Sequence, residues 1–210
     1  LEKPVLKFIY RLFAIFLMAG SMMEIGNAEE NTNTKETAVF AAGCFWCIQG
    51  SFDSEKGVIS TLVGYTGGDK VESVDYETVS SGSTGHAEAI QVTYDPKAVS
   101  YKRLLEIFWT NIDPTTTKGQ FCDIGSQYRP EIFFSGLAQK QEAEASLSWA
   151  KGKLQAGEIV VPITPVTKFY TAEEYHQKYY LSHPIRYKLY RKGCGRDERL
   201  QELWGDSTKE

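Results

Sequence analysis

The stretch from Ala38 to Cys47, AVFAAGCFWC, constrains the fold of this chain more than any other. Its apolar first half is typical of a short buried strand, Gly43 permits a sharp turn, and the residues that follow have helix-compatible spacing. The sequence therefore predicts strand, turn and helix, with Cys44 at the helix N-terminus and Cys47 one turn later on the same face. Unpaired backbone N–H groups and the helix dipole favour a thiolate there, so we expect a lowered pKa and a nucleophilic sulfur at Cys44.

Other interpretations of this cysteine pair have to be weighed. A structural disulfide is one; a zinc site is another, although no second Cys-x-x-Cys or Cys-x-x-His follows. Haem attachment is excluded by Ile48, where a histidine would be needed. Strand, turn, Cys-x-x-Cys and helix also describe a thioredoxin-like dithiol–disulfide oxidoreductase, but here Trp46 lies between the cysteines rather than before them. A non-catalytic peptide-binding module would require an unreactive Cys44.

Residues 1–28 differ in character from the rest of the chain. Three basic residues precede an apolar run over residues 12–20: Lys3, Lys7 and Arg11. The segment ends in the small residue Ala28, a layout typical of a secretory signal peptide cleaved near that residue. We therefore expect an exported, periplasmic protein in an oxidising compartment. The alternative is an uncleaved membrane anchor, although the apolar run is shorter than the roughly 20 residues of a span. Residues 29–36 are polar and are predicted to be a disordered lead-in.

Strand-like and helix-like patterns alternate through the rest of the chain. Strands are predicted over 58–65, 88–94 and 130–135, with an edge strand over 159–169. Helices are predicted over 100–111, 136–156 and 171–180. This order predicts an α+β fold, a two-layer sandwich of a mixed sheet with helices, related to ferredoxin-like topology. The catalytic domain is assigned to 37–190 and a flexible C-terminal tail, which carries Cys194, to 191–210.

The segment from Glu88 to Tyr94 alternates cleanly between two faces. The more apolar face holds Ile90, Val92 and Tyr94, and Glu88 falls on that same face. A carboxyl group at the mouth of an apolar face keeps its proton to higher pH, which suits an acid catalyst. The alternative is a solvated glutamate at a strand end.

The net charge of −4, with no basic stripe, argues against nucleic acid as a partner.

Four motifs follow one another along the chain: GCFW at 43–46, GHAE at 85–88 followed by VTYDP at 92–96, DIGSQYR at 123–129, and EEYHQ at 173–177. In this order they closely resemble the motifs of the A-type peptide methionine sulfoxide reductases, over nearly the whole of residues 37–190. The resemblance implies reduction of the S epimer of methionine sulfoxide, free or in proteins, to methionine, and thus repair of oxidised proteins. It implies no metal and no organic cofactor.

The chemistry of a sulfoxide agrees with this resemblance, because its sulfur becomes electrophilic only when its oxygen is protonated or strongly hydrogen-bonded. The resemblance implies that Cys44 attacks the sulfur and that Glu88 supplies the proton. It further implies two hydroxyl donors to the oxygen, one residue that organises the pocket and two aromatic residues around the S-methyl group: Tyr76 with Tyr128, Asp123, and Phe45 with Trp46. For the two aromatic residues, ordinary core packing is the alternative.

Attack would leave Cys44 as a sulfenic acid, with which a second thiol must condense. We favour Cys47 as the resolving cysteine, since at i+3 it reaches Cys44 with only local adjustment. Cys194 resembles the tail cysteine of other members and would pass the disulfide outward. Cys122 stands where those members usually have asparagine, and its role stays open. We expect a monomer, recycled by a thioredoxin-like reductant.

Overall fold

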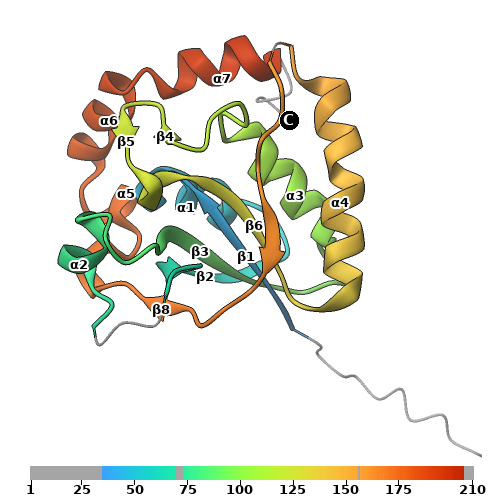
Figure 1. Cartoon of the computed structure of the whole chain (residues 1–210), viewed down its shortest axis with the longest axis horizontal. Coiled ribbons are helices and arrows are strands. Elements are labelled where there is room, and N and C mark those ends of the chain that lie inside the picture. The colour runs from blue at the N-terminus through green and yellow to red at the C-terminus, as the bar shows by residue number, and fades with distance from the viewer. Residues whose placement is uncertain (1–34, 70–72, 156, 206–210) are drawn as a thin grey trace, which may run out of the picture. The chain divides into compact units, whose positions relative to one another are not determined.

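The computed structural model describes residues 35–69, 73–155 and 157–205 (Figure 1). The predicted signal peptide and all but the end of the predicted lead-in lie outside these ranges. Within them, no helix combines the length and the apolar character needed to cross a membrane.

Six strands form a mixed sheet in the order β7-β6-β1-β3-β2-β8 (Figure 1). Their bounds are β1 Glu36–Ala42, β2 Val58–Thr66, β3 Ala87–Tyr94, β6 Pro130–Phe134, β7 Ile163–Pro165 and β8 Tyr170–Thr171. The β6–β7 pair is parallel and the other pairs are antiparallel. Outside this sheet, β4 (Gly119–Gln120) pairs with β5 (Asp123–Ile124) in a short hairpin.

The helices are α1 Phe45–Asp53, α2 Tyr76–Ser80, α3 Tyr101–Thr110, α4 Gly136–Lys153, α5 Tyr179–Ser182, α6 Pro184–Gly193 and α7 Arg196–Trp204. Two 3-10 turns cover Ser126–Tyr128 and Glu174–His176. The succession β1-α1-β2-β3-α3-β6, laid out in space as β6-β1-β3-β2, is the arrangement of a ferredoxin-like fold. The predicted fold class is therefore confirmed.

The main core lies between one face of the sheet and helices α1 and α3. Phe40 on β1 stacks on Phe52 of α1 and on Phe108 of α3, with ring centroids 5.3 Å apart in both pairs. On β3 the predicted apolar face is confirmed, because Ile90, Val92 and Tyr94 are fully buried. Glu88, on that same face, is also buried, which excludes a solvated strand-end glutamate.

The predicted helix over 171–180 is wrong. Tyr170 and Thr171 instead pair with β2, and a 3-10 turn follows at Glu174–His176. The side chain of Glu173 accepts hydrogen bonds from the Tyr65 hydroxyl and the Tyr76 backbone N–H, both at 2.8 Å. Long-range hydrogen bonds thus hold this segment where the sequence predicts a helix.

The prediction of a flexible tail after residue 190 is also wrong for the residues that the structure describes. Helix α7 buries one apolar stripe, formed by Leu200, Leu203 and Trp204, against the main core. The Trp204 indole N–H donates to the carbonyl oxygen of Ile112 at 2.8 Å. The charged composition of this segment hides a stripe with helical i, i+3, i+4 spacing.

Candidate active site

Cys44 lies at the turn between β1 and α1, where it is the N-cap residue of the helix. Gly43 makes this turn with a φ of +80°, and a Cβ there would lie 2.6 Å from the Cβ of Gln120, so both the conformation and the space require glycine. The buried Arg196 donates hydrogen bonds to the carbonyl oxygens of Ala42, at 3.2 Å, and Asn111, at 2.6 Å. Arg196 thereby anchors the end of the strand that delivers Cys44.

A cavity of about 150 Å³ opens beside Cys44. Its lining consists of Cys44, Phe45, Trp46, Tyr76, Glu88, Asp123, Tyr128 and Tyr190. The structure thus brings together the predicted catalytic residues and both predicted substrate-binding residues, although they come from separate segments of the chain. Tyr190, on α6, was not predicted.

The expected lowering of the Cys44 pKa is wrong. Burial, a hydrogen bond with Cys47 and the charge of Glu88 raise the pKa of the Cys44 thiol well above its ordinary value. Only 5% of Cys44 is exposed, so desolvation of the anion outweighs the favourable helix N-terminus. Cys44 therefore holds its proton at neutral pH.

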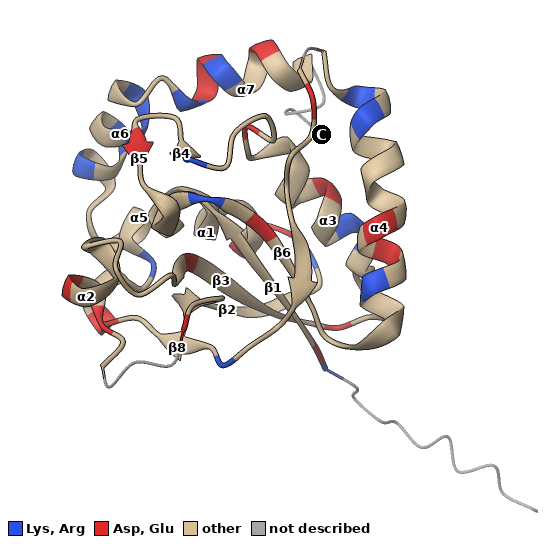
Figure 2. Ribbon diagram, viewed as in Figure 1, with Lys and Arg blue, Asp and Glu red and all other residues tan. Residues whose placement is uncertain are grey.

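Cys47 shows the opposite behaviour. A hydrogen bond with Cys44 and the positive charges of Arg196 and Arg191 lower the pKa of Cys47 to about 7, against the effect of burial. Helix α6 carries several basic side chains, and α7 begins with Arg196 (Figure 2). The thiolate of this buried pair therefore resides on Cys47, stabilised by the C-terminal helices.

Glu88 is placed to act as an acid. Burial raises its pKa to about 8, although the backbone N–H of Phe45 donates to its Oε2 at 3.0 Å and opposes the rise. The carboxyl group is therefore mostly protonated at pH 7, beside the cavity that contains the Cys44 sulfur. This confirms the direction of the pKa shift that the strand pattern predicts.

An aromatic wall forms one side of the cavity. Trp46 stacks on Tyr179, with centroids 3.9 Å apart, and its indole N–H donates to Nδ1 of His176 at 3.0 Å. Burial lowers the pKa of His176, so the ring is neutral and can accept this hydrogen bond. His176 lies within the fourth sequence motif, but no pattern in the sequence indicates its role as the partner of Trp46.

The two predicted hydroxyl donors approach the cavity from different elements. Tyr76 is the first residue of α2, and its backbone N–H donates to Oε1 of Glu173 at 2.8 Å. Tyr128 ends the 3-10 turn at Ser126–Tyr128. Burial raises the pKa of both phenols, so both keep the proton that a hydrogen-bond donor needs.

The predicted pocket organiser Asp123 meets Tyr190 at the edge of the cavity. The Tyr190 hydroxyl donates to Asp123 Oδ1 at 2.5 Å. Burial raises the pKa of Asp123, and this hydrogen bond opposes the rise. A cluster of tyrosines in the C-terminal segment was the only signal in the sequence that could have pointed to Tyr190.

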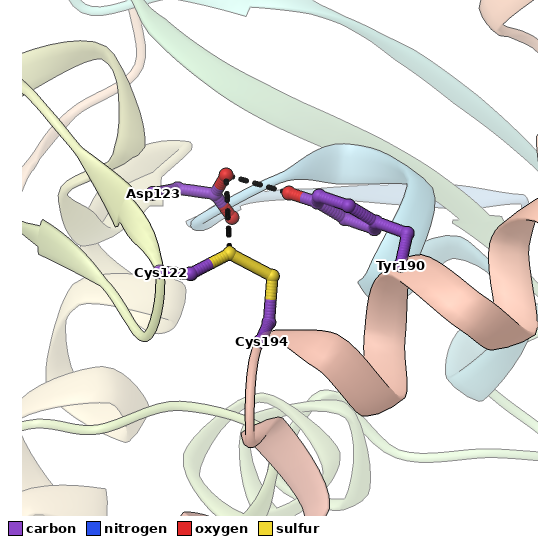
Figure 3. The surroundings of a disulfide bond; sticks show 4 residues. All are labelled: Cys122, Asp123, Tyr190 and Cys194. Carbon is purple, nitrogen blue, oxygen red and sulfur yellow. Dashed lines mark hydrogen bonds between the residues drawn. A yellow bond between two sulfur atoms is a disulfide. The ribbon is translucent and has the colours of Figure 1, made fainter.

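A disulfide joins Cys122 to Cys194, next to Asp123 and Tyr190 (Figure 3). It links residues 72 positions apart, with a Cα–Cα distance of 4.9 Å. Cys44 and Cys47 both carry free thiols. The pairing gives Cys122, whose role the sequence left open, a partner in Cys194.

In the parts of the chain that the structure describes, one group of potential metal ligands lies close together: Cys122, Asp123 and Cys194. Its two sulfur atoms are bonded to each other. As a disulfide, these sulfurs are not the thiolates that bind metal ions.

Comparison with known proteins places this geometry in a family. Residues 36–208 match the family model described as peptide methionine sulfoxide reductase. The chain is 42% identical to "Peptide methionine sulfoxide reductase MsrA 2" of Caulobacter vibrioides, over 93% of this chain and 98% of that protein. It is 46% identical to the MsrA of Bacillus subtilis, over 81% of this chain and 97% of that protein.

Solved structures with similar folds carry related names. The crystal structure of Mxr1 from Saccharomyces cerevisiae in reduced form matches with a TM-score of 0.66 and 32% identity, covering 73% of this chain and 88% of that one. Methionine sulfoxide reductase A of Corynebacterium diphtheriae matches with a TM-score of 0.66 and 30% identity, covering 72% and 76%.

Proposed function

The chain belongs to the peptide methionine sulfoxide reductase family, and from this premise we propose that it reduces the S epimer of methionine sulfoxide, free or in proteins, to methionine. One observation carries the proposal: the predicted nucleophile, acid, hydroxyl donors and aromatic wall line a single small cavity. A protonated carboxyl and two phenols beside a thiol are the groups that a sulfoxide oxygen and sulfur require.

The first step is attack of Cys44 on the sulfoxide sulfur. The Cys47 thiolate, which is hydrogen-bonded to Cys44, takes the Cys44 proton, and Glu88 protonates the oxygen while Tyr76 and Tyr128 donate hydrogen bonds to it. The oxygen passes to Cys44 as a sulfenic acid and methionine leaves. Thiol and sulfoxide thus become sulfenic acid and sulfide, with every atom accounted for.

Cys47 resolves the sulfenic acid. Its sulfur attacks the Cys44 sulfur, a Cys44–Cys47 disulfide forms, and the hydroxyl leaves as water with one proton. Cys44 and Cys47 lie within one turn at the start of α1, where the Cys47 N–H donates to the Cys44 carbonyl oxygen at 3.0 Å. This proximity supports Cys47 as the resolving cysteine. One sulfoxide therefore consumes two thiols.

The reductant that restores these thiols is a thioredoxin-like protein dithiol, and the working form is a single chain. This chain supplies the thiol, the acid and both hydroxyl donors that line the cavity, which supports a single-chain working form. The basic and apolar pattern of residues 1–28 supports export to the periplasm, with membrane anchoring through the same segment as the alternative.

The experiment is a single turnover by pre-reduced protein on a methionine sulfoxide peptide, without added thiol. Wild type should yield methionine from the S epimer and not the R epimer, with loss of thiols. Cys44→Ser should yield none. Cys47→Ser should yield at most one methionine per chain, and more slowly, because it lacks both the base that takes the Cys44 proton and the resolving thiol. Methionine formation that survives Cys44→Ser would overturn the proposal.

A further inference from the structure

We propose that the outer face of α6 is a docking surface for membranes that contain anionic phospholipid. This face consists of Ile185, Arg186, Lys188, Leu189 and Lys192. The inference goes beyond the proposed function, because it concerns where the protein binds and does not depend on the reaction.

Helix α6 lies on the surface and has two different faces. Tyr187, Tyr190 and Arg191 share one face by their i, i+3 and i+4 spacing and are half-buried, so this face packs against the rest of the chain. Tyr190 lines the cavity, and Arg191 donates to the carbonyl oxygen of Cys47 at 3.0 Å. No residue of α6 is buried, and the five residues of the outer face are all exposed. The outer face therefore contributes nothing to the core.

The outer face is unusual because it carries aliphatic side chains. Ile185 and Leu189 lie one turn apart and are 76% and 69% exposed. A surface helix ordinarily has the reverse arrangement, with apolar residues towards the core and polar residues towards solvent. Two aliphatic side chains that project together from one face indicate a partner with an apolar layer.

Exposed cations flank the two aliphatic side chains. Lys188 and Lys192 lie one turn apart on one side of the pair, and Arg186 lies on the other side. Among the ion pairs of the described residues, none involves any of these three side chains. Their charges are therefore available to a partner.

The charge has one sign over a longer stretch. Residues 178–196 include six Lys and Arg residues and no Asp or Glu, in a chain whose net charge is −4. All charged residues of α6 are basic (Figure 2). An anionic partner would therefore attract this part of the molecule and orient α6 towards itself.

A bilayer with anionic headgroups matches both properties of the face. Its aliphatic side chains can enter the boundary between headgroups and acyl chains, while the flanking Lys and Arg side chains extend to the phosphates. An acidic polypeptide would match the charge but would provide no apolar layer for Ile185 and Leu189. Residues 1–28, proposed above to direct export or to anchor the chain, would bring it to a membrane in either case.

The docking surface is separate from the catalytic residues. Tyr190 is the α6 residue that lines the cavity, and it belongs to the opposite face. Variants of the outer face should therefore form methionine from a soluble peptide as wild type does. A failure of membrane docking and a failure of the proposed function can thus be told apart.

The test measures sedimentation of the full chain with vesicles, made either of phosphatidylglycerol and phosphatidylcholine in equal amounts or of phosphatidylcholine alone. We expect wild type to bind the mixed vesicles at least about tenfold more tightly than phosphatidylcholine, with weaker binding at high salt. Two multiple variants should each lower the partition coefficient by about tenfold or more: R186Q/K188Q/K192Q and I185S/L189S. The mixed vesicles should also slow amide hydrogen exchange in 184–193.

Matched variants at exposed positions of α4 are the controls. Leu137→Ser removes a leucine that is 69% exposed, as Leu189 is, and Lys151→Gln removes an exposed cation. Both variants should bind the mixed vesicles as tightly as wild type does.

Binding that survives both multiple variants would overturn the proposal, because residues 1–28 or another surface would then account for it. Absence of binding by wild type would also overturn it. A loss confined to the variant without the three cations, together with tight binding of wild type to polyglutamate, would assign the face to acidic polypeptides and overturn the membrane as its partner.

Discussion

The two cysteine pairs of this protein lie in contrasting surroundings. We call Cys44 and Cys47 the inner pair and Cys122 and Cys194 the outer pair. Cys44 and Cys47 are buried at the start of α1, against Glu88 and the aromatic wall, whereas Cys122–Cys194 lies at the surface between the β4–β5 hairpin and α6. A small cavity with a buried carboxyl group suits the reduction of a sulfoxide, because burial raises the pKa of the acid. The Cys122–Cys194 sulfurs, by contrast, are accessible from outside the molecule. The chain thus carries a buried thiol pair and a crosslink at its surface, and variants of each can be compared.

The largest expected effect is the difference in activity between a variant of the inner pair and a variant of the outer pair. Cys44→Ser should lower steady-state reduction of methionine sulfoxide by about 10³-fold or more, because it removes the nucleophile. Cys194→Ser should keep activity within about twofold when a small dithiol, which can enter the cavity, is the reductant. Both rates are measured as methionine formed. A comparable loss in both variants would remove the distinction between the pairs.

Glu88→Gln tests the acid of the inner site. We expect a loss of about 10² to 10³-fold in kcat, because the amide cannot donate a proton. Wild-type activity should decline as the pH rises through about 8, where Glu88 loses its proton, and the variant should lack this alkaline limb. Glu77→Gln, at an exposed position in α2, is the control and should keep the wild-type profile.

The same variant makes a prediction about stability. The pKa of the Glu88 carboxyl is higher in the folded chain, about 8, than in the unfolded chain. Its contribution to stability is therefore complete below the unfolded pKa and is lost as the pH rises towards 8. Glu88→Gln should therefore gain about 4 kcal/mol of unfolding free energy relative to wild type on going from pH 4.5 to pH 8. An unchanged difference between the two pH values would contradict an acid buried in this way.

Leu203→Ala tests whether the segment around the outer pair is core. Leu203 is 1% exposed in α7, so its truncation should cost about 2 to 4 kcal/mol of unfolding free energy, measured by urea denaturation. Leu189→Ala in α6, where the side chain is 69% exposed, should stay within about 0.5 kcal/mol of wild type. Equal small effects would restore the interpretation of a loose C-terminal tail.

Tyr190→Phe carries the smallest expected effect. It removes the hydroxyl that donates to Asp123 and leaves the ring in place, a loss of about 1 kcal/mol, or roughly fivefold in kcat/KM. Tyr187→Phe, in the same helix but outside the cavity lining, is the matched control. Loss of the same size in both variants would argue that Tyr190 acts only through the packing of α6.

The sequence predicted the inner site well because its signals are local. Strand alternation places Glu88 on the core face, and the glycine turn places Cys44 at the start of α1. The resemblance to a known family supplied the residues that come from distant loops, such as Tyr76 and Tyr128. The structure brings these residues to one cavity.

The features that the sequence missed depend on long-range contacts. Charged residues mask the apolar stripe of α7, and no spacing rule links Cys122 to Cys194 across 72 positions. The Cys44 pKa was predicted in the wrong direction because a helix N-terminus can be read from sequence, whereas the depth of burial that outweighs it cannot. Tyr190 and the Trp46 partner His176 were missed for the same reason.

The most direct test of the division between inner and outer pairs is the order in which disulfides appear. Fully reduced protein is mixed with one equivalent of methionine sulfoxide peptide, quenched in acid at increasing times and mapped by mass spectrometry without reduction. The account predicts Cys44–Cys47 as the first disulfide, and no disulfide driven by sulfoxide in Cys44→Ser. A first disulfide between Cys44 and either Cys122 or Cys194 would contradict it.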